Sequence, residues 1–210
     1  CTTIFAVVVA VPLGVLAAWK AHTWIDRGVM LFAVMGFSVP VFVIGYVLMW
    51  VFSLTLGWFP VQGYKPIGEG IGPFLSSIAL PTLALGLVYV ALIARMTRAS
   101  VMEVLTEDYI RTARAKGVNN RTLLMRHALK NASVPIVTII GVGVALLIGG
   151  VVVTESVFNI PGLGRLTIDA VLRRDYPIIQ GVILIFSGIY VLVNLVIDLS
   201  YTVLDPRIRY

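Results

Sequence analysis

Long apolar runs separated by short polar segments dominate the chain, and five of them are long enough to cross a bilayer as helices. Such a helix needs about 20 mostly apolar residues. The runs cover 2–19, 29–52, 74–94, 134–153 and 178–197. None of them alternates strictly between apolar and polar positions, as the strands of a membrane barrel would. The pattern predicts an all-α polytopic membrane protein with five transmembrane helices within these 210 residues.

Composition agrees with a bilayer as the solvent for most of the chain. Hydrophobic residues make up 59% of the sequence and charged residues 12%, whereas soluble domains carry about 25% charged residues. The net charge of +6 would also suit a nucleic-acid-binding protein. That class is excluded because the charges are confined to short segments between the apolar runs.

The basic residues are distributed unevenly between the two predicted sides of the membrane. Short cytoplasmic loops are enriched in lysine and arginine, and segment 95–133 holds eight of them. If that segment is cytoplasmic, alternating crossings put 20–28 and 198–210 on the same side, and 53–73 and 154–177 outside. The inner set is Lys20, Arg27, Arg95, Arg98, Arg111, Arg114, Lys116, Arg121, Arg126, Lys130, Arg207 and Arg209, and the outer set is Lys65, Arg165, Arg173 and Arg174. The 12 basic residues inside against 4 outside support the topology in which segment 95–133 is cytoplasmic.

The chain opens with Cys1 inside an apolar run, which predicts that an amino-terminal part with a sixth helix precedes it. A signal peptide over 1–19 is the alternative, but that segment lacks a basic start and a small-residue cleavage site. A single cysteine allows no internal disulfide. With only two isolated histidines, His22 and His127, no metal site is expected.

Ionisable side chains are nearly absent from the apolar runs, and Glu155 and Asp198 lie near run ends. Ion-coupled transporters usually carry such a group at mid-membrane depth. The pattern therefore disfavours a secondary transporter and indicates that energy enters elsewhere.

Small residues and a proline mark further positions inside the runs. Gly141, Ala145 and Gly149 recur every four residues, a spacing that lets helices approach closely in lipid. Pro40, in GFSVPVFVIGY, is either simply tolerated in a membrane helix or opens helix backbone beside a translocation pathway. It is the pathway candidate.

Segment 108–131, DYIRTARAKGVNNRTLLMRHALKN, is rich in basic charge. Residues 99–116 have a helix-forming composition, and Gly117 is predicted to end this helix because glycine takes a positive φ easily. At about 100° per residue, one face carries Ala and Gly beside an aromatic and an aliphatic residue. That face holds Tyr109, Ile110, Ala113 and Gly117, and the other side holds Arg111 and Arg114. It is too shallow for a thick core but suits close docking of another surface.

A second short helix is predicted over 121–131, capped by Asn119 or Asn120. Its apolar side holds Leu124, Met125 and Ala128, opposite Arg126 and Lys130. The residues alone leave three alternative roles for the segment. It could be a solvated loop whose charges only enforce topology, a basic amphipathic segment on anionic lipid, or a docking element for a partner.

The segment resembles the signature loop of the membrane subunits of bacterial ATP-binding-cassette importers. That loop reads Glu-Ala-Ala, three residues, Gly, nine residues, then Ile-x-Leu-Pro. Ala113, Gly117 and Leu129 match it, whereas Arg111, Thr112, His127 and Lys130 depart from it. The stretches DYIRTARAKG and MRHALKNA are similar to the variant found in dipeptide, oligopeptide, nickel and glutathione importer permeases. TESVFNIPGLGRL (154–166), RRDYPIIQG (173–181) and DLSYTVLDPRIRY (198–210) resemble that family's outer segment and carboxy-terminal ending.

The resemblance implies a type I importer transmembrane domain over 1–210, with 95–133 as its ATPase-coupling loop, in a multi-pass subunit of the bacterial inner membrane. In that family two permease subunits form the pathway. Two cytoplasmic ATPases dock on their loops, and a periplasmic or lipid-anchored binding protein delivers the ligand. The coupling residues implied here are Tyr109, Arg111, Thr112, Ala113, Arg114, Lys116 and Gly117.

No catalytic residue, cofactor or metal is assigned to this chain. It lacks the phosphate-binding motif Gly-x-x-x-x-Gly-Lys-Ser/Thr, whose backbone and lysine hold nucleotide phosphates. ATP and Mg²⁺ are therefore expected on the partner ATPase.

On the outer side, the resemblance implies that 154–177 dips back into the mouth of the pathway and meets the binding protein. A plain connector with a turn at NIPGLG is the alternative. Non-helical backbone at membrane depth requires a cavity or covering protein. The implied contact residues are Asn159, Pro161, Gly162, Arg173, Arg174 and Asp175.

The expected function is a permease subunit, not an enzyme, of an ATP-driven, binding-protein-dependent importer for di- or oligopeptides. Nickel or glutathione is the alternative substrate within the same family. Outside that family, a stand-alone channel, a membrane scaffold and an intramembrane enzyme remain. The enzyme would need a constellation such as Ser with His, or paired Asp, inside the bilayer.

Overall fold

The computed structural model describes residues 1–204, and within them the chain folds into helices without a strand. The α-helices are α1 (Thr2–Trp19), α2 (Trp24–Ser38), α3 (Val41–Leu48), α4 (Ile71–Leu105), α5 (Asp108–Ala115), α6 (Asn120–Thr122), α7 (Leu129–Asn131), α8 (Ser133–Phe158), α9 (Leu163–Arg173) and α10 (Tyr176–Leu204). Two π-helices, η1 (Met49–Thr55) and η3 (Leu123–Ala128), and the 3₁₀ turn η2 (Ile67–Glu69) complete the described part. The predicted all-α class is confirmed.

Within residues 1–204, three helices, α1, α4 and α10, are by themselves long and apolar enough to cross a membrane. The predicted number of five is reached when each of two bent helix pairs is counted as one span. The first pair joins α2 to α3 and η1 with a bend of 103°. The second joins the α6–α7 segment to the first part of α8 with a bend of 58°.

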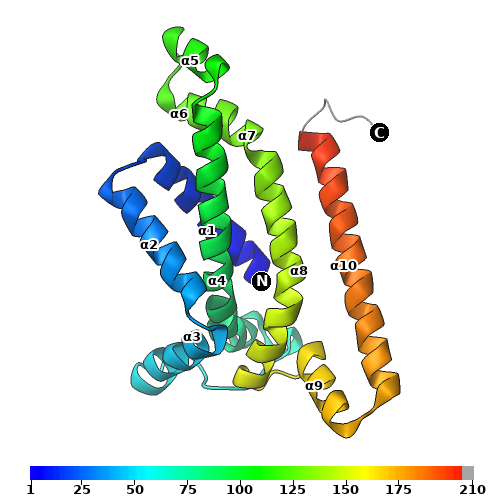
Figure 1. Cartoon of the computed structure of the whole chain (residues 1–210). Coiled ribbons are helices and arrows are strands. Elements are labelled where there is room, and N and C mark those ends of the chain that lie inside the picture. The colour runs from blue at the N-terminus through cyan, green and yellow to red at the C-terminus, as the bar shows by residue number, and fades with distance from the viewer. Residues whose placement is uncertain (205–210) are drawn as a thin grey trace.

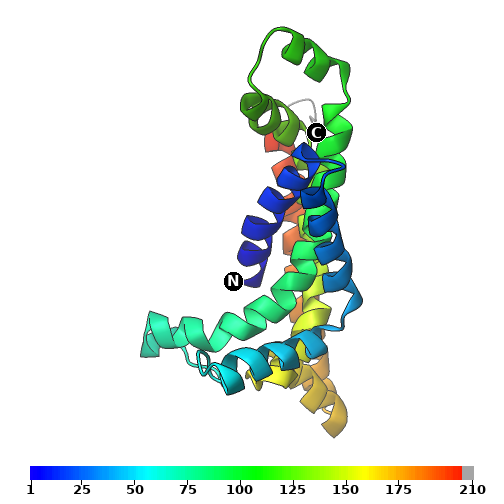
Figure 2. The ribbon, with the colours of Figure 1, turned by 90° about the vertical axis from the view of Figure 1, so that its left-hand side faces the viewer.

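The helix predicted over 29–52 is not continuous, because the chain breaks at Pro40. Val39 takes an extended conformation, with φ −94° and ψ 127°, as residues before proline prefer. Proline also has no N–H for a helical hydrogen bond, so α2 ends at Ser38. Figure 2 shows α3 and the beginning of α4 running sideways at the base of the other helices.

The predicted boundary between the third apolar run and the basic loop is also wrong. Helix α4 continues through 35 residues to Leu105, so Arg95 and Arg98 belong to a long helix and not to a loop. The single helix predicted over 99–116 is instead divided at Thr106 and Glu107, where α4 ends and α5 begins.

The polar segments gather at two ends of the molecule, as the charge distribution predicts (Figure 1). The α1–α2 turn, the α5–α7 segment and the last described turn of α10 lie at one end. The α3–α4 connection and α9 lie at the other. Arg207 and Arg209 lie outside the described residues.

All four tryptophans of the chain lie near these two ends, where aromatic side chains favour the membrane–water interface. Trp19 and Trp24 flank the α1–α2 turn, and their rings lie near Lys20 and Arg27, at 5.4 and 5.1 Å from the cationic groups. The other two are on η1 and the loop that follows it. The arrangement marks both edges of the membrane layer.

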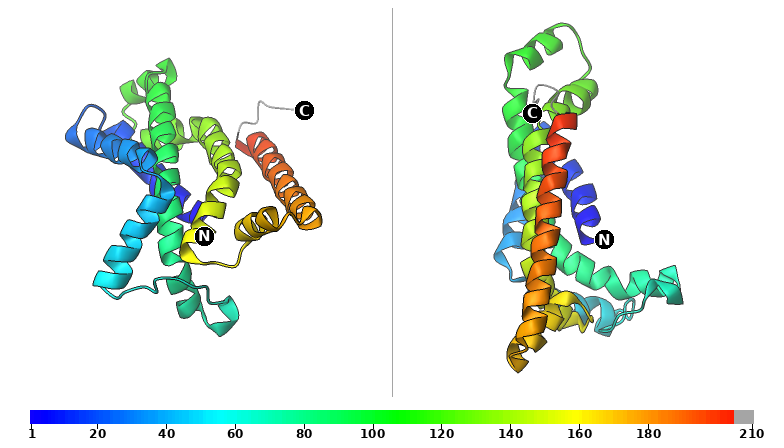
Figure 3. Two further views of the ribbon diagram at one scale, coloured as in Figure 1. Left: turned by 60° about the horizontal axis from the view of Figure 1, so that its bottom comes forward. Right: turned by 90° about the vertical axis from the view of Figure 1, so that its right-hand side faces the viewer.

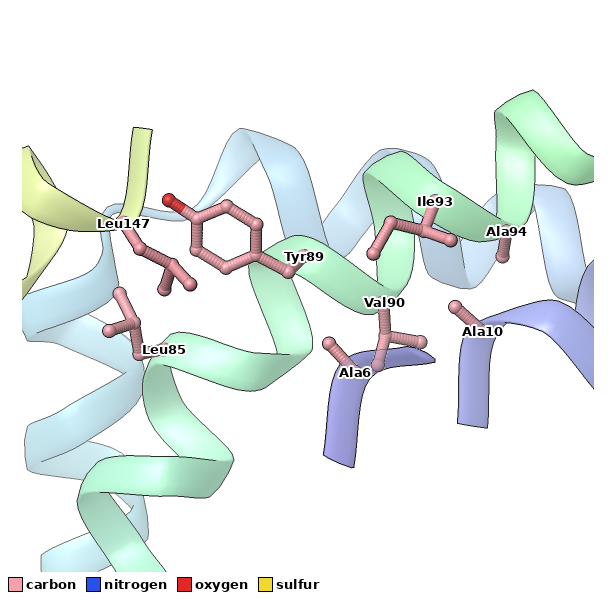
Figure 4. Close-up of a cluster of buried hydrophobic side chains, with 8 residues drawn as sticks. All are labelled: Ala6, Ala10, Leu85, Tyr89, Val90, Ile93, Ala94 and Leu147. Atoms are coloured by element: carbon pink, nitrogen blue, oxygen red, sulfur yellow. The ribbon is translucent and has the colours of Figure 1, made fainter. Parts of the chain in front are cut away.

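The main packing surface joins α1 to α4 through small residues. Ala6, Ala10 and Gly14 recur every four residues on α1, and all are buried. A β-carbon on Gly14 would lie 2.6 Å from the carbonyl oxygen of Ala94. Figure 4 shows the alanines of α1 meeting the apolar side chains of α4, with Leu147 of α8 beside them. Close approach of this kind is what stabilises helix pairs in lipid.

Of the glycine–alanine series predicted to mediate close packing on α8, the structure supports its first member. A β-carbon on Gly141 would overlap the side chain of Ile197 on α10. Gly149 is exposed and has open space around it. Helix α10 lies at the edge of the molecule (Figure 3). Beyond its contacts with α8 and α9, most of its large apolar side chains are exposed.

The two ends of the molecule are expected to face opposite compartments. With Cys1 replaced, a single cysteine at Asn120 should react only with cytoplasmic maleimide, and one at Gly68 only with external maleimide. Both positions are exposed. External labelling at 120 would contradict the topology.

Candidate functional site

The basic segment after α4 forms a helical hairpin, defined here as residues 108–131 (Figure 1). Its first helix, α5, ends at a turn in which Gly117 has φ +79°. The N–H of Gly117 donates to the carbonyl of Arg114 at 3.0 Å, and the N–H of Val118 donates to that of Ala113 at 3.2 Å. The predicted glycine turn is therefore confirmed.

The predicted shallow face of α5 is divided between the interior and the solvent. Ile110 is 1% exposed and faces the rest of the chain. Tyr109 remains partly exposed, and its hydroxyl accepts a hydrogen bond of 2.6 Å from the side-chain amide of Asn131. Ala113 is half-buried, whereas Gly117 is exposed. The apolar part of this face thus anchors α5 to the chain itself.

The outward surface of α5 is polar and positively charged. Its exposed members include Arg111, Thr112, Arg114 and Ala115, and Lys116, directly after the helix, is exposed as well. Asp108 forms an exposed ion pair of 3.3 Å with Arg111, and such pairs contribute little to stability. The hairpin therefore presents a basic surface beyond the end of α4.

The second helical part of the hairpin begins at a predicted capping residue. The side chain of Asn119, rather than Asn120, accepts a hydrogen bond of 3.2 Å from the N–H of Arg121. The helix that follows is continuous through residue 131 but contains the six-residue π-helix η3.

The base of the hairpin is packed on three other helices. Leu124 and Ala128 are buried, as predicted, in a cluster with Val15 of α1, Val101 of α4 and Ile136 of α8. Met125, predicted on the same side, is 53% exposed, because the π-helix changes the angular spacing of its residues. The hairpin is thus fixed at its base and free at its tip.

At the opposite end, an outer turn (residues 155–165) connects α8 to α9. Asn159 takes the left-handed conformation, with φ +54°, and its side-chain oxygen accepts a hydrogen bond from the guanidinium of Arg165. The carboxylate of Glu155 accepts the backbone N–H of Arg165 at 2.9 Å. Pro161 and Gly162 line an external hollow together with Arg165.

The six outer residues predicted to meet a partner lie in two groups, one at each end of α9. Asn159, Pro161 and Gly162 precede α9, whereas Arg173, Arg174 and Asp175 follow it. Because α9 has 11 residues, about 16 Å of helix separates the two groups. Asp175 caps α10 by accepting the N–H of Ile178 at 3.3 Å, and Arg173 and Arg174 are exposed.

Comparison with known proteins decides the family. A family profile described as "Binding-protein-dependent transport system inner membrane component" matches residues 10–210. The chain belongs to this family. The family resemblance seen in the sequence is therefore confirmed, and the chain is a multi-pass component of the inner membrane.

Curated relatives resemble the permease over its whole length. A probable peptide ABC transporter permease protein of Sinorhizobium fredii is 55% identical over 100% of this chain and 67% of the relative. The dipeptide transport system permease protein DppB of Alkalihalophilus pseudofirmus is 40% identical over 99% of this chain and 68% of the relative. The glutathione transport system permease protein GsiC of Escherichia coli is 46% identical over 99% of this chain and 65% of the relative. The chain spans about two thirds of the length of these relatives.

The pathway candidate of the permease, Pro40, lies exposed at the junction of α2 and α3. Its carbonyl oxygen accepts the N–H groups of Val43 and Ile44 at 3.0 and 3.2 Å, which begins α3. The predicted opening of helix backbone is present, and the predicted role beside a pathway stays a prediction.

One interaction in the permease could not be predicted from the sequence, because its two partners are distant along the chain. Arg98 of α4 donates from Nε and Nη2 to the two carboxylate oxygens of Asp26 at 2.5 and 2.7 Å. The N–H of His22 donates to the same carboxylate at 2.9 Å. Asp26 is 4% exposed. Arg98, which from the sequence only supported a cytoplasmic side, therefore links α4 to the start of α2 through this ion pair.

Proposed function

We propose that the permease is the translocating subunit of an ATP-driven importer for small peptides. Its family serves binding-protein-dependent transport, and relatives at 40–55% identity are named for peptide, dipeptide and glutathione transport. Glutathione is itself a small peptide. These names share one substrate class, peptides of a few residues, and the permease is assigned to that class.

In this proposal the hairpin is the docking element for a cytoplasmic ATPase. The observation that carries it is the basic tip of the hairpin, which extends beyond α4 and includes exposed Arg111, Arg114 and Lys116. A partner with an acidic cleft would complement this surface, and such complementarity speeds association. The ATPase would bind ATP and Mg²⁺, and this chain would perform no hydrolysis.

The packed base of the hairpin supports a mechanical role. A displacement of α5 would press on η3, whose Leu123 and Leu124 are buried. The chain then continues through α7 directly into α8, so the displacement would reach a membrane-crossing helix. A second permease subunit would complete the pathway, and a solute-binding protein would deliver the peptide at the end that carries α9.

Charge reversal at the hairpin tip tests this function. The variant Arg111→Glu with Arg114→Glu, within the full-length transporter, should lose copurification of the ATPase by about tenfold or more, because like charges oppose close docking. Uptake of a labelled dipeptide into proteoliposomes should fall in parallel. Arg121→Gln, beyond the glycine turn, is the matched control. Dipeptide uptake by the permease without any ATPase would instead identify a stand-alone channel.

A further inference from the structure

The amino-terminal end of α9 is capped by a side chain from another helix. Its own cap position, Gly162, has no side chain, and the first N–H groups of a helix have no partner within it. The carboxylate of Glu155, on α8, accepts the N–H of Arg165 at 2.9 Å. A negative charge is also favoured at a helix amino terminus.

Two glycines leave the space that this carboxylate occupies. A β-carbon on Gly162 would overlap the carboxylate of Glu155. A β-carbon on Gly164 would lie 2.6 Å from the Cα of Val152 and 3.0 Å from Oε2 of Glu155. The backbone of α9 therefore approaches α8 directly at this point, with the acidic group between them.

The end of α8 is held on its other side as well. The N–H of Gly63 donates to the carbonyl of Phe158 at 3.1 Å. The side-chain amide of Gln62 donates to the carbonyl of Val157, also at 3.1 Å. The last turn of α8 is thus hydrogen-bonded to the loop after η1, and Glu155 links the same turn to α9.

Helix α8 extends from the base of the hairpin to this outer turn (Figure 1). Its 26 residues correspond to roughly 39 Å of helix. A displacement that enters α8 near Ser133 would reach α9 only if the junction between the two helices is stiff.

We propose that Glu155 is a positioning residue that fixes α9 to α8, so that α8 and α9 move as one body at the outer end of the permease. This inference rests on the proposed function for its consequence in transport, but the stiffness of the junction can be measured without it. When the carboxylate is removed, the backbone of residues 159–162 becomes a hinge and α9 separates from the end of α8.

The stiffness is tested by a distance measurement within the permease, reconstituted in lipid nanodiscs without partners. With Cys1 replaced, spin labels at Val153 and Ile168, which are 38% and 37% exposed, report the α8–α9 distance. Glu155→Ala should broaden the distance distribution, with the separated population rising about tenfold, because the N–H of Arg165 then loses its acceptor. Glu155→Gln should keep a narrow distribution, since its amide oxygen still accepts the N–H.

The neighbouring Ser156→Ala is the matched control, because that hydroxyl donates to the carbonyl of Val152 within its own helix and makes no bond to α9 among the described residues. If Glu155→Ala accumulates poorly in membranes, Glu155→Asp replaces it, and its shorter side chain should give an intermediate broadening. A distribution for Glu155→Ala as narrow as that of the unmodified chain would overturn the proposal.

The consequence for transport is measured separately in the assembled transporter. Glu155→Ala should reduce dipeptide uptake about tenfold while ATPase copurification stays unchanged, and Glu155→Gln should restore uptake. Broadened distances with undiminished uptake would show that a stiff junction is not needed. If the unmodified assembly shows no ATP-dependent uptake, the proposed function fails, and the nanodisc distances still decide whether Glu155 holds α9.

Discussion

Gly117→Val is expected to abolish coupled peptide uptake while leaving the permease in the membrane. Gly117 has φ +79°, a region that β-branched residues avoid. A β-carbon there would meet no atom within 4 Å, so the change acts through the backbone turn and not through a clash within this chain. The hairpin would then present its basic surface at a different angle, or would present valine where a partner must approach.

The size of the effect follows from the contact that is lost. If misorientation removes about 2.8 kcal/mol of ATPase binding, association weakens about a hundredfold. Uptake and ATPase copurification are compared at matched membrane levels. Gly117→Asn is the control, because asparagine adopts the left-handed conformation far more readily than valine. If Gly117→Val transports at the unmodified rate, the hairpin is not the coupling element, and the solvated-loop interpretation replaces it.

Arg98→Met is expected to destabilise the permease strongly, by about 3–5 kcal/mol, because it leaves a buried carboxylate without its cation. Asp26 is 4% exposed and would keep only the N–H of His22. Asp26→Asn should cost less, since the side chain of Arg98 is already 23% exposed and can extend toward water. Thermal unfolding in detergent gives the comparison.

The double variant Asp26→Leu with Arg98→Met should recover part of the lost stability, because it removes both charges together. The coupling between the two sites is obtained from the double-mutant cycle. Equal melting temperatures for the unmodified chain and Arg98→Met would show that this ion pair does not fasten α2 to α4.

The positions and class of the main helices could be predicted from the sequence because hydropathy is a local property. A run of about 20 apolar residues has few alternatives to a helix in lipid, where the backbone must satisfy its own hydrogen bonds. Thus α1, α8 and α10 appear where the apolar runs predict them. The turn at Gly117 and a cap at Asn119 or Asn120 were predictable for the same reason, since each depends on the preference of one residue for a backbone conformation.

The direction of the chain beyond a break was decided by packing between distant segments. Pro40 shows that a helix cannot continue straight, but the 103° bend after Ser38 depends on the contacts of α3 with α4 and α8. The face of α5 that turns inward was likewise unpredictable, because Ile110 is buried only when η3 folds back beneath it.

Polar pairs between distant residues required the tertiary structure most of all. Asp26 and Arg98 are 72 positions apart, and the sequence around each of them predicts only an ordinary charge at the membrane interface. Glu155 lies ten residues before Arg165, and the glycine-rich stretch between them was the one local signal of close approach. Short-range preferences in the sequence were enough to locate the apolar helices and the residues that permit a turn, but not the helix α9, which lies in a polar outer segment. Which charges meet across helices, and therefore which helices move together, was decided only when the fold brought them within hydrogen-bonding distance.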